Sequence, residues 1–438
     1  MAAPPPAPKS ILRGHKAQVH AACFLQQNER LATGDADGFV VLWDLAIMRP
    51  RAVWRAHETA ILDIRGWGRD RIITHGRDHK LIVWKVAAVD QERLSTALPV
   101  EVVPERPQPW MLHMLQVNTM NFCAFACCPE KAGETFDQSQ EILIAVPNTL
   151  ESEAIDIFQL PSQARLHTVR PGKANGMAMC LGLLHSQAHL LLVSAFENGF
   201  ACVHRLGSDG SWTMTYRSQA HTQPILSLAV DPSNEYFLTS SADADIAKHP
   251  LPLEKKATEP AFDPNNRIIE EVDDHASQPT SSSLSAQLKA SASRSTPSQP
   301  KLVEKEHTET INSINTKHSG QQSLHIRSDG RIFATAGWDS QVRVYSCKTL
   351  KELAVLSWHK VGCYAVAFAV VDVPTNTTPS AAATGAAEDG KGKHGSTVLA
   401  ARKQGGLGVK ERRMHQARGA HWIAAGAKDG RVSLWDIY

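Results

Sequence analysis

Three segments of the 438-residue chain share one pattern: Leu31-Ala-Thr-Gly-Asp-Ala-Asp-Gly-Phe-Val-Val-Leu-Trp-Asp44, Ile73-Thr-His-Gly-Arg-Asp-His-Lys-Leu-Ile-Val-Trp84 and Ala424-Ala-Gly-Ala-Lys-Asp-Gly-Arg-Val-Ser-Leu-Trp-Asp436. In each, an apolar run leads into a tight turn with an Asp, and a second apolar run closes on Trp. Alternation such as Val-x-Leu-Trp is typical of a strand with one buried face. Each segment therefore predicts two antiparallel strands joined by a turn, and their recurrence indicates an internally repeated fold.

A fixed spacing extends this repeat to segments that lack Trp. An Asp or Asn precedes a closing ring by six residues at Asp37 before Trp43, Asp78 before Trp84, Asn198 before His204, Asp243 before His249, Asp339 before Tyr345 and Asp429 before Trp435. A hydroxyl stands ten residues before the ring at Thr33, Thr74, Ser194, Thr239 and Thr335, whereas Ala425 breaks this rule. Upstream of the segments a His recurs, at His15, His57, His221, His318 and His359.

These six copies, with one further unit at 120–158 that keeps only the strand pattern, give seven units. The strands predicted for the degenerate units are 120–125, 142–146 and 154–158; 176–181, 190–194 and 199–204; 225–230, 236–239 and 245–249; and 322–326, 332–335 and 341–345. The seventh unit begins with 363–368 and ends at Trp435. The sequence thus predicts an all-β, seven-bladed β-propeller, in which each blade adds its own share of core.

The two ends of the chain predict how the ring closes. The sequence ends three residues after Trp435, so the seventh unit lacks an outer strand of its own. Lys9-Ser-Ile-Leu-Arg13 can supply that strand, which would remove an exposed sheet edge. We therefore expect residues 1–8 to be a flexible N-terminus and residues 9–438 to form a single propeller.

Four insertions interrupt the repeat, at about 86–108, 129–141, 251–309 and 372–419. Each falls between the first and second or the third and fourth strand of a unit, and in a propeller these connections share one face. The short Asp-bearing turns lie on the opposite face, which we call the compact face. Two readings stay open for the Ser-rich stretch 277–298 (phosphorylated or inert) and for the basic run Lys410-Glu-Arg-Arg413 (a localisation signal or a solvated charge cluster).

Composition argues against several classes of function. The net charge of +2 gives no reason to expect nucleic-acid binding, and no apolar run approaches the roughly 20 residues of a membrane span. The N-terminus lacks the features of a signal peptide, which predicts an intracellular chain. Cys123, Cys127 and Cys128 cluster without a second Cys or His pair at zinc-binding spacing. We expect no catalytic, metal or cofactor site, no cofactor and no small-molecule substrate, because no nucleophile–base pair or phosphate-binding loop is present.

The repeated His, hydroxyl, Asp and ring resemble the WD-repeat family, whose blades carry a hydrogen-bond relay through these four groups. The resemblance implies a structural relay in blade one through His15, Thr33, Asp37 and Trp43, and in blade two through His57, Thr74, Asp78 and Trp84. Such a network pairs polar groups that a packed interior cannot leave unsatisfied. The alternative is that these His and Asp residues are metal ligands or a catalytic dyad. The periodicity favours the structural interpretation, because an active site needs one constellation and not several copies.

The segment Pro109-Trp-Met-Leu-His-Met-Leu-Gln-Val-Asn-Thr-Met-Asn-Phe-Cys-Ala-Phe125 departs from an ordinary WD repeat, because Val117-Asn118-Thr119 stands where Gly-His is expected. Together with Arg13-Gly-His15 and the C-terminal Lys428-Asp-Gly-Arg-Val-Ser-Leu-Trp-Asp-Ile-Tyr438, it resembles the ASTRA-associated WD-repeat proteins of fungi, which are similar to the animal G-protein β-subunit-like protein. The resemblance implies a nuclear subunit of the ASTRA complex, with a cytoplasmic pool as a further option. It also implies links to chromatin remodelling and to co-chaperones that mature phosphatidylinositol-3-kinase-related kinases.

The preferred hypothesis is a non-catalytic scaffold whose compact face binds protein partners in a multi-subunit complex. The candidate partner-binding residues are Arg77, Asn118, Thr119, Asn148, Glu151, Glu197, Trp338 and Lys428. Trp and Arg dominate interface hot spots, although Trp338 could instead pack against a neighbouring blade. The alternative is a reader of a histone or phosphopeptide ligand through the same face. An enzyme in the central channel would need convergent acids or a nucleophile that the sequence does not show.

Overall fold

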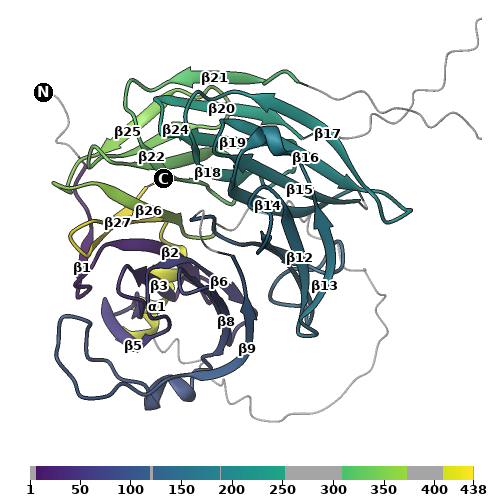
Figure 1. Cartoon of the computed structure of the whole chain (residues 1–438). Helices are drawn as coiled ribbons and strands as arrows, with labels where there is room; N and C mark the ends of the chain where they lie inside the picture. The colour runs from purple at the N-terminus through teal and green to yellow at the C-terminus, as the bar shows by residue number, and fades with distance from the viewer. Residues whose placement is uncertain (1–5, 119–121, 188, 252–307, 372–407, 438) are drawn as a thin grey trace, which may run out of the picture. The chain divides into compact units, whose positions relative to one another are not determined.

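The alternating apolar strands pair into seven four-stranded antiparallel sheets, the blades of a β-propeller (Figure 1). The structure, a computed structural model, describes residues 6–118, 122–187, 189–251, 308–371 and 408–437. The prediction of an all-β, seven-bladed propeller is confirmed. The N-terminal stretch 1–5, the long insertion around 251–309 with its Ser-rich part, and most of the insertion around 372–419 lie outside the described residues.

Within each of the first six blades the four strands pair in chain order. Blades one to three consist of β2 (Val19–Leu25), β3 (Arg30–Asp35), β4 (Phe39–Asp44) and β5 (Arg49–Arg55); β6 (Ile61–Trp67), β7 (Arg71–Gly76), β8 (Lys80–Lys85) and β9 (Trp110–Gln116); and β10 (Ala126–Pro129), β11 (Ile142–Pro147), β12 (Ile155–Leu160) and β13 (Ala164–Val169). Blades four to six consist of β14 (Ala178–Ser186), β15 (His189–Phe196), β16 (Phe200–Leu206) and β17 (Trp212–Gln219); β18 (Ile225–Val230), β19 (Tyr236–Ser241), β20 (Asp245–Pro250) and β21 (Asn312–Asn315); and β22 (Gln321–Ile326), β23 (Ile332–Gly337), β24 (Val342–Ser346) and β25 (Glu352–Leu356).

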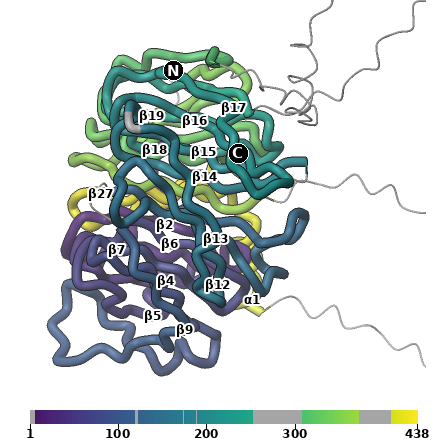
Figure 2. The backbone as a smooth tube through the Cα atoms, turned by 45° about the vertical axis from the view of Figure 1, so that its right-hand side comes forward, coloured from purple at the N-terminus to yellow at the C-terminus, as the bar shows by residue number. Residues whose placement is uncertain are grey.

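The first strand of every blade lines a central channel, and the apolar core lies between blades. The described residues form seven buried clusters, one at each blade-to-blade interface. Blades three and four, for example, lie side by side in both views and bury Leu143, Ile157, Leu192 and Phe196 between them (Figures 1 and 2). Burial of apolar side chains at every interface is what holds the repeated sheets together.

The predicted terminal latch is confirmed in blade seven. Strand β1 (Ser10–Arg13) pairs antiparallel with β28 (Arg431–Asp436), outside β27 (Trp422–Ala427) and the channel-lining β26 (Cys363–Phe368). Leu12 of the latch is 3% exposed and packs with Trp422 and Leu434 in the cluster shared by blades seven and one. The N-terminal strand therefore completes the last blade with both hydrogen bonds and core packing.

The first strand of blade three is not where the sequence predicted it. We expected it at 120–125, but β10 begins at Ala126. Phe122 has a φ of +60°, outside the extended region, and its side chain is 57% exposed, so the chain turns here instead of continuing as a strand. Met120 and Asn121 lie outside the described residues.

The four insertions connect β8 to β9, β10 to β11, β20 to β21 and β26 to β27. As predicted, each lies between the first and second or the third and fourth strand of a blade. The first contains the 3-10 helix η1 (Asp90–Arg93), and η2 (Lys173–Asn175) precedes β14. The fourth contains a helix that the sequence analysis missed, α1 (Val409–Gly419), which includes the exposed basic run 410–413. Three contacts anchor its C-terminal end. Ala417 is buried, Arg418 pairs with Glu29, and Trp422 Nε1 donates to the Ala417 carbonyl over 3.0 Å. No helix in the described part of the chain is long and apolar enough to cross a membrane.

Candidate partner-binding face

The compact face is held by hydrogen-bond relays, which are complete in blades one and two. In blade two, His57 Nδ1 lies 2.8 Å from Asp78 Oδ1, and its Nε2 lies 2.8 Å from Thr74 Oγ1. Trp84 Nε1 donates to the same Thr74 oxygen over 2.8 Å. The four residues predicted for this relay are thus in contact, and they tie the connection before β6 to the turn between β7 and β8.

The donors in this relay follow from chemistry. A carboxylate only accepts, so His57 Nδ1–H donates to Asp78, and the tautomer that protonates Nδ1 leaves Nε2 to accept the hydrogen of Thr74. The Thr74 oxygen then accepts from Trp84. Burial by itself would raise the pKa of Asp78, but the hydrogen bonds from His57 and from the Glu58 backbone hold that pKa below its ordinary value. Asp78 is therefore an ionised acceptor at neutral pH.

In blade one the acid of the relay is Asp35, and our assignment of Asp37 is wrong. His15 bonds Asp35 Oδ2 and Thr33 Oγ1 over 2.7 Å each, and Trp43 Nε1 donates to Thr33 over 2.8 Å. Asp37 is exposed, and its backbone N–H donates to Asp35 Oδ1. The corresponding strand end in blade two is Gly76, where a Cβ would lie 2.3 Å from His57 Nδ1. The carboxylate of the relay therefore comes from the strand end in blade one and from the turn in blade two.

Blade five keeps the relay with a substitution, whereas blade seven keeps it without the acid, since His359 Nδ1 has no hydrogen-bond partner in the described residues. In blade five His221 bonds Asp243 and Thr239, and His249 replaces Trp by bonding Thr239 over 2.8 Å. In blade seven His359 Nε2 and Trp435 Nε1 both bond Ser433, over 2.8 and 2.9 Å. Ser433 is the cross-strand partner of Ala425. The hydroxyl that Ala425 lacks is therefore supplied by the neighbouring strand.

Blade six does not form the relay that its spacing predicts. His318 is exposed and only its Nδ1 approaches Asp339, at 3.5 Å. Asp339 instead pairs with the buried Arg343, whose Nη2 lies 2.6 Å from Oδ2. The hydroxyls of Thr335 and Tyr345 interact only with one another, beyond ordinary hydrogen-bond geometry, in the described part of the chain. His318 therefore does not insert into blade six as His57 inserts into blade two.

The first strand of six blades contains a β-bulge near the compact face. In each, one residue falls between two paired positions, as His20 does between Val19 and Ala21. The bulged residues are His20, Leu62, Met179, Leu226, Gln322 and Tyr364, and all six line the channel. A bulge re-aims a side chain, here toward the channel axis. The compact-face end of the channel, which we call the compact mouth, is consequently ringed by half-buried, largely apolar side chains.

Aromatic and cationic groups complete the compact mouth. The Trp338 side chain is 48% exposed, and its Nε1 donates to Gln322 Oε1 over 2.9 Å. Its ring lies on Gly320, where a Cβ would approach Trp338 Cε3 to 2.1 Å. The Arg77 guanidinium carbon lies 3.8 Å from the centroid of the Phe122 ring. His20 and Tyr364 stack with centroids 5.5 Å apart.

The structure therefore places the predicted partner-binding residues in different surroundings. Arg77 and Trp338 both line the channel at the compact mouth, and Lys428 is exposed away from the channel lining. Glu197 is half-buried, Glu151 is half-buried and pairs with Arg170 over 2.9 Å, and Asn118 donates to the Asn148 carbonyl over 2.7 Å. Thr119 lies outside the described residues.

Asn148 is not a surface residue, which corrects its assignment to the partner-binding set. It is 6% exposed, accepts the backbone N–H groups of Leu150 and Glu151, and donates to Asp156 Oδ2 over 2.9 Å. Thr168 donates to the other Asp156 oxygen over 2.6 Å. This amide replaces the relay in blade three by bracing the turn from within.

The residues of the compact mouth that sequence reasoning missed are Phe122 and the bulged residues, because a bulge leaves no signal in the apolar alternation.

The channel encloses about 1360 Å³ and is lined by the first strands of all seven blades. Burial raises the pKa of Cys23 to about 11 and of Cys127 to about 12, so both thiols are protonated at neutral pH. No group of three or more His, Cys, Asp or Glu side chains that could hold a metal ion occurs in the ranges that the structure describes. The relays use their His and Asp residues to join strands, and their geometry is that of a structural network.

These features define the class: a WD-repeat-like, seven-bladed β-propeller closed by an N-terminal strand, with a compact face of braced turns around an apolar mouth. Comparison with known proteins identifies the family. The family model for ASTRA-associated protein 1 matches residues 8–435. A protein of that name from Pyricularia oryzae is 50% identical over 100% of this chain and 99% of its own length. One from Verticillium alfalfae is 50% identical over 99% and 93%, and one from Schizosaccharomyces pombe is 29% identical over 83% and 93%. The chain belongs to the ASTRA-associated protein 1 family.

Proposed function

We propose that the chain is a non-catalytic scaffold subunit of the ASTRA complex and that it binds a protein partner through the compact mouth. Membership is supported by the name that its relatives carry, ASTRA-associated protein 1. The single observation that carries the docking proposal is the mouth itself. Its bulged side chains Leu62, Met179 and Leu226 are only half-buried, and the neighbouring Trp338 and Phe122 are 48% and 57% exposed.

The composition of the compact mouth suits a protein partner. Exposed apolar side chains rimmed by polar groups mark interaction sites, because burying them against a partner removes them from water. Trp338 keeps a polar handle in the Nε1–H bonded to Gln322, and Arg77 keeps a cation beside the apolar ring. Trp and Arg are also the residue types whose loss costs most in alanine scans. A partner that inserts an apolar side chain into the mouth would contact both.

We extend the proposal to the setting of the complex. The chain acts in the nucleus, with a cytoplasmic pool as an alternative, in chromatin remodelling and in the maturation of phosphatidylinositol-3-kinase-related kinases. Its partners are proteins, without direct nucleic-acid or membrane binding and without a small-molecule substrate. These statements rest on the family resemblance, since a fold by itself does not determine function.

Affinity purification tests the membership. The full-length chain is tagged at its native level and its co-purifying proteins are identified by mass spectrometry, with nuclear and cytoplasmic fractions analysed separately. We expect a defined set of ASTRA subunits in the nuclear fraction at constant ratios across salt washes. Recovery of the chain alone, or of a set without ASTRA subunits, contradicts the proposal.

The alternative function, a reader of a histone or phosphopeptide, makes a different demand on the same mouth. A reader needs free aromatic faces, yet one face of Phe122 contacts Arg77, Tyr364 stacks on His20, and Trp338 lies on Gly320. The surroundings of these rings therefore favour the scaffold. A modified-histone peptide array separates the two, because a scaffold gives no modification-dependent signal and a reader does.

A further inference from the structure

One level of the channel, formed by the middle of the first strands, contains an arginine. The second strand of each blade has one residue directly before the position of the relay hydroxyl. The first-strand residue that pairs with it lies at this level of the channel. In blades four, five and seven this residue is small: Gly182, Ala229 and Ala367. In the other four blades it is Cys23, Arg65, Cys127 and His325. All of these residues line the channel, and we call this level the Arg65 ring.

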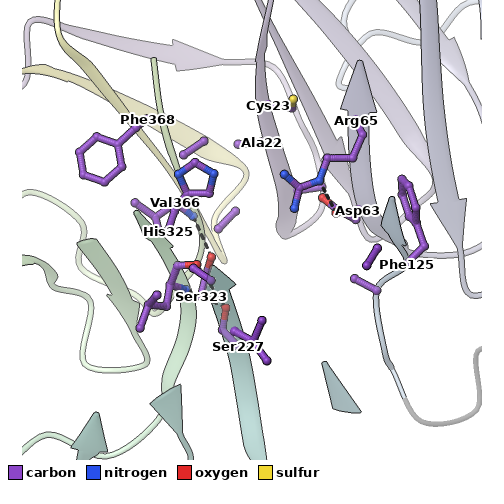
Figure 3. A pocket seen from close by; sticks show the side chains of 18 of the residues that line it. Ala22, Cys23, Asp63, Arg65, Phe125, Ser227, Ser323, His325, Val366 and Phe368 are labelled. Carbon is purple, nitrogen blue, oxygen red and sulfur yellow. Dashed lines mark hydrogen bonds and ion pairs between the residues drawn. The ribbon is translucent and has the colours of Figure 1, made fainter. Parts of the chain in front are cut away.

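Arg65 is only partly neutralised. Its Nε donates to Asp63 Oδ2 over 2.9 Å (Figure 3). No hydrogen bond from its two Nη atoms occurs within the described residues, and 47% of the side-chain surface remains accessible. That surface faces the channel, which the first strands of all seven blades line. The other charged residues of the channel wall (Arg77, Asp137, Asp231 and Arg418) come from the turns, loops and helix at its two ends.

His325 faces the same space from blade six (Figure 3). Its Nδ1 has no hydrogen-bond partner in the part of the chain that the structure describes. Burial, with a smaller contribution from the charge of Arg65, lowers the pKa of His325 to about 4, so the ring is neutral near pH 7. Because Nδ1 is buried, only Nε2 of the neutral imidazole can donate its N–H to an acceptor in the channel.

An oxyanion satisfies this arrangement. A guanidinium offers five N–H groups in a planar fork, and Asp63 uses one edge of it, which leaves the Nη edge for a second acceptor. The small residues Gly182, Ala229 and Ala367 leave room on the opposite side of the ring. A charge-assisted bond gains strength where solvent is restricted by the channel wall.

We propose that the Arg65 ring is a binding site for a small oxyanion, a phosphate or a carboxylate, held by the Nη edge of Arg65 with His325 as a second donor. Bound there, the anion would bridge the first strands of blades two and six across the channel. It would stabilise the closed ring by mass action, since only the folded chain assembles the site. The site is separate from the compact mouth and does not depend on the proposed partner.

Two substitutions with opposite expected signs test the proposal. Inorganic phosphate and citrate are titrated separately into the full-length chain, with binding followed by calorimetry and by the midpoint of thermal unfolding. In Arg65→Gln the affinity should fall by about tenfold to a hundredfold, the worth of one charge-assisted hydrogen bond. In Asp63→Asn it should rise, because the competing carboxylate is removed while Arg65 remains. Arg331→Gln, at an exposed arginine on the insertion-bearing face, is the matched control and should bind as the wild type does.

The two probes identify the chemistry of the ligand, since a site for phosphate and a site for carboxylates rank them in opposite order. Equal affinity in the wild type, Arg65→Gln and Asp63→Asn would overturn the proposal, as would the absence of binding by either anion. A loss in Arg331→Gln as large as in Arg65→Gln would show nonspecific ion binding and overturn it too. Co-purification of partners is expected to be unchanged in Arg65→Gln, so failure here is distinct from failure of the proposed docking surface.

Discussion

Blade two and blade six have the same spacing of hydroxyl, acid and ring, yet the structure uses it differently. In blade two His57 enters the blade and connects Thr74 to Asp78, with both hydrogen bonds at 2.8 Å. In blade six His318 stays exposed and 3.5 Å from Asp339, whose charge is balanced by Arg343. The spacing therefore predicts the strands of both blades, but it predicts the relay only where the His can insert.

The difference has a consequence for the surface. The turn residue directly before the Asp is Arg77 in blade two, where the acid is Asp78, and Trp338 in blade six, where it is Asp339. Because blade six is braced through Arg343 and not through a buried His, Trp338 can lie on Gly320 at the compact mouth. We infer that the relay blades supply rigidity and that blade six, which lacks a relay as blades three and four do, supplies an exposed aromatic side chain.

The largest expected difference between the blades comes from removing the His. His57→Ala leaves Asp78 and Thr74 without their shared partner inside a packed blade, and should lower the free energy of unfolding by about 3 kcal/mol. His318→Ala removes an exposed, weakly paired ring and should cost less than about 0.5 kcal/mol. Urea unfolding followed by fluorescence measures both. Equal losses would mean that the relay of blade two has no special role.

Removal of the hydroxyl should give a smaller contrast. Thr74→Val keeps the side-chain shape but deprives Trp84 Nε1 and His57 Nε2 of their partner, which should cost about 2 kcal/mol. Thr335→Val removes a hydroxyl whose contact with Tyr345 falls outside ordinary hydrogen-bond geometry, and should be nearly neutral. The same unfolding measurement decides, and a destabilised Thr335→Val chain would show that blade six has a hidden relay.

Acid should weaken the relay of blade two. The pKa of Asp78 lies below its ordinary value of 3.8, so its contribution to stability is fully present above that value and is lost as the pH falls through the lower folded-state pKa. We therefore expect the free energy of unfolding to decline below about pH 4. The decline should be shallower in Asp78→Asn, in which this carboxyl no longer titrates. Urea midpoints measured from pH 6 to pH 2 test this, and parallel curves for the two chains would contradict it.

A small effect on stability is also expected at the compact mouth. Trp338→Ala removes a half-exposed ring and should change the free energy of unfolding by about 1 kcal/mol or less. Gly320→Ala, at a φ of +73°, should displace the same ring, because its Cβ would occupy the space of Trp338 Cε3. An aqueous quencher should reduce the fluorescence of Trp338 more strongly in the second variant than in the wild type. Unchanged quenching would show that the ring does not rest on Gly320.

Much of this fold could be predicted because strand, turn and strand repeat along the chain. Predictions that depended on pairing between strands were less secure. The six-residue rule chose Asp37 over Asp35, since it counts along the chain while the relay depends on which carboxylate faces His15. The same limit hid Ser433, which stands opposite Ala425 on the next strand.

The candidate surface was predicted only in part. Arg77 and Trp338 could be found because the turn places the residue before each Asp at the surface. Asn148 was misplaced because a polar turn residue can brace its own turn, as it does here by bonding Asp156. The bulged residues could not be found, since a bulge moves a side chain by shifting backbone pairing and leaves composition unchanged. Helix α1 was missed because its residues are polar on nearly every side and show no apolar stripe.

The central claim is that the compact mouth binds the partner, and quantitative co-purification of a double variant tests it most directly. Full-length Trp338→Ala/Arg77→Ala and the control Lys428→Ala/Glu197→Ala, which changes the same face away from the mouth, are purified beside the wild type. Thermal unfolding confirms that each is folded. The account predicts that partner recovery falls at least about tenfold in the mouth variant and stays at the wild-type level in the control. Full retention of partners by the folded mouth variant would contradict the account.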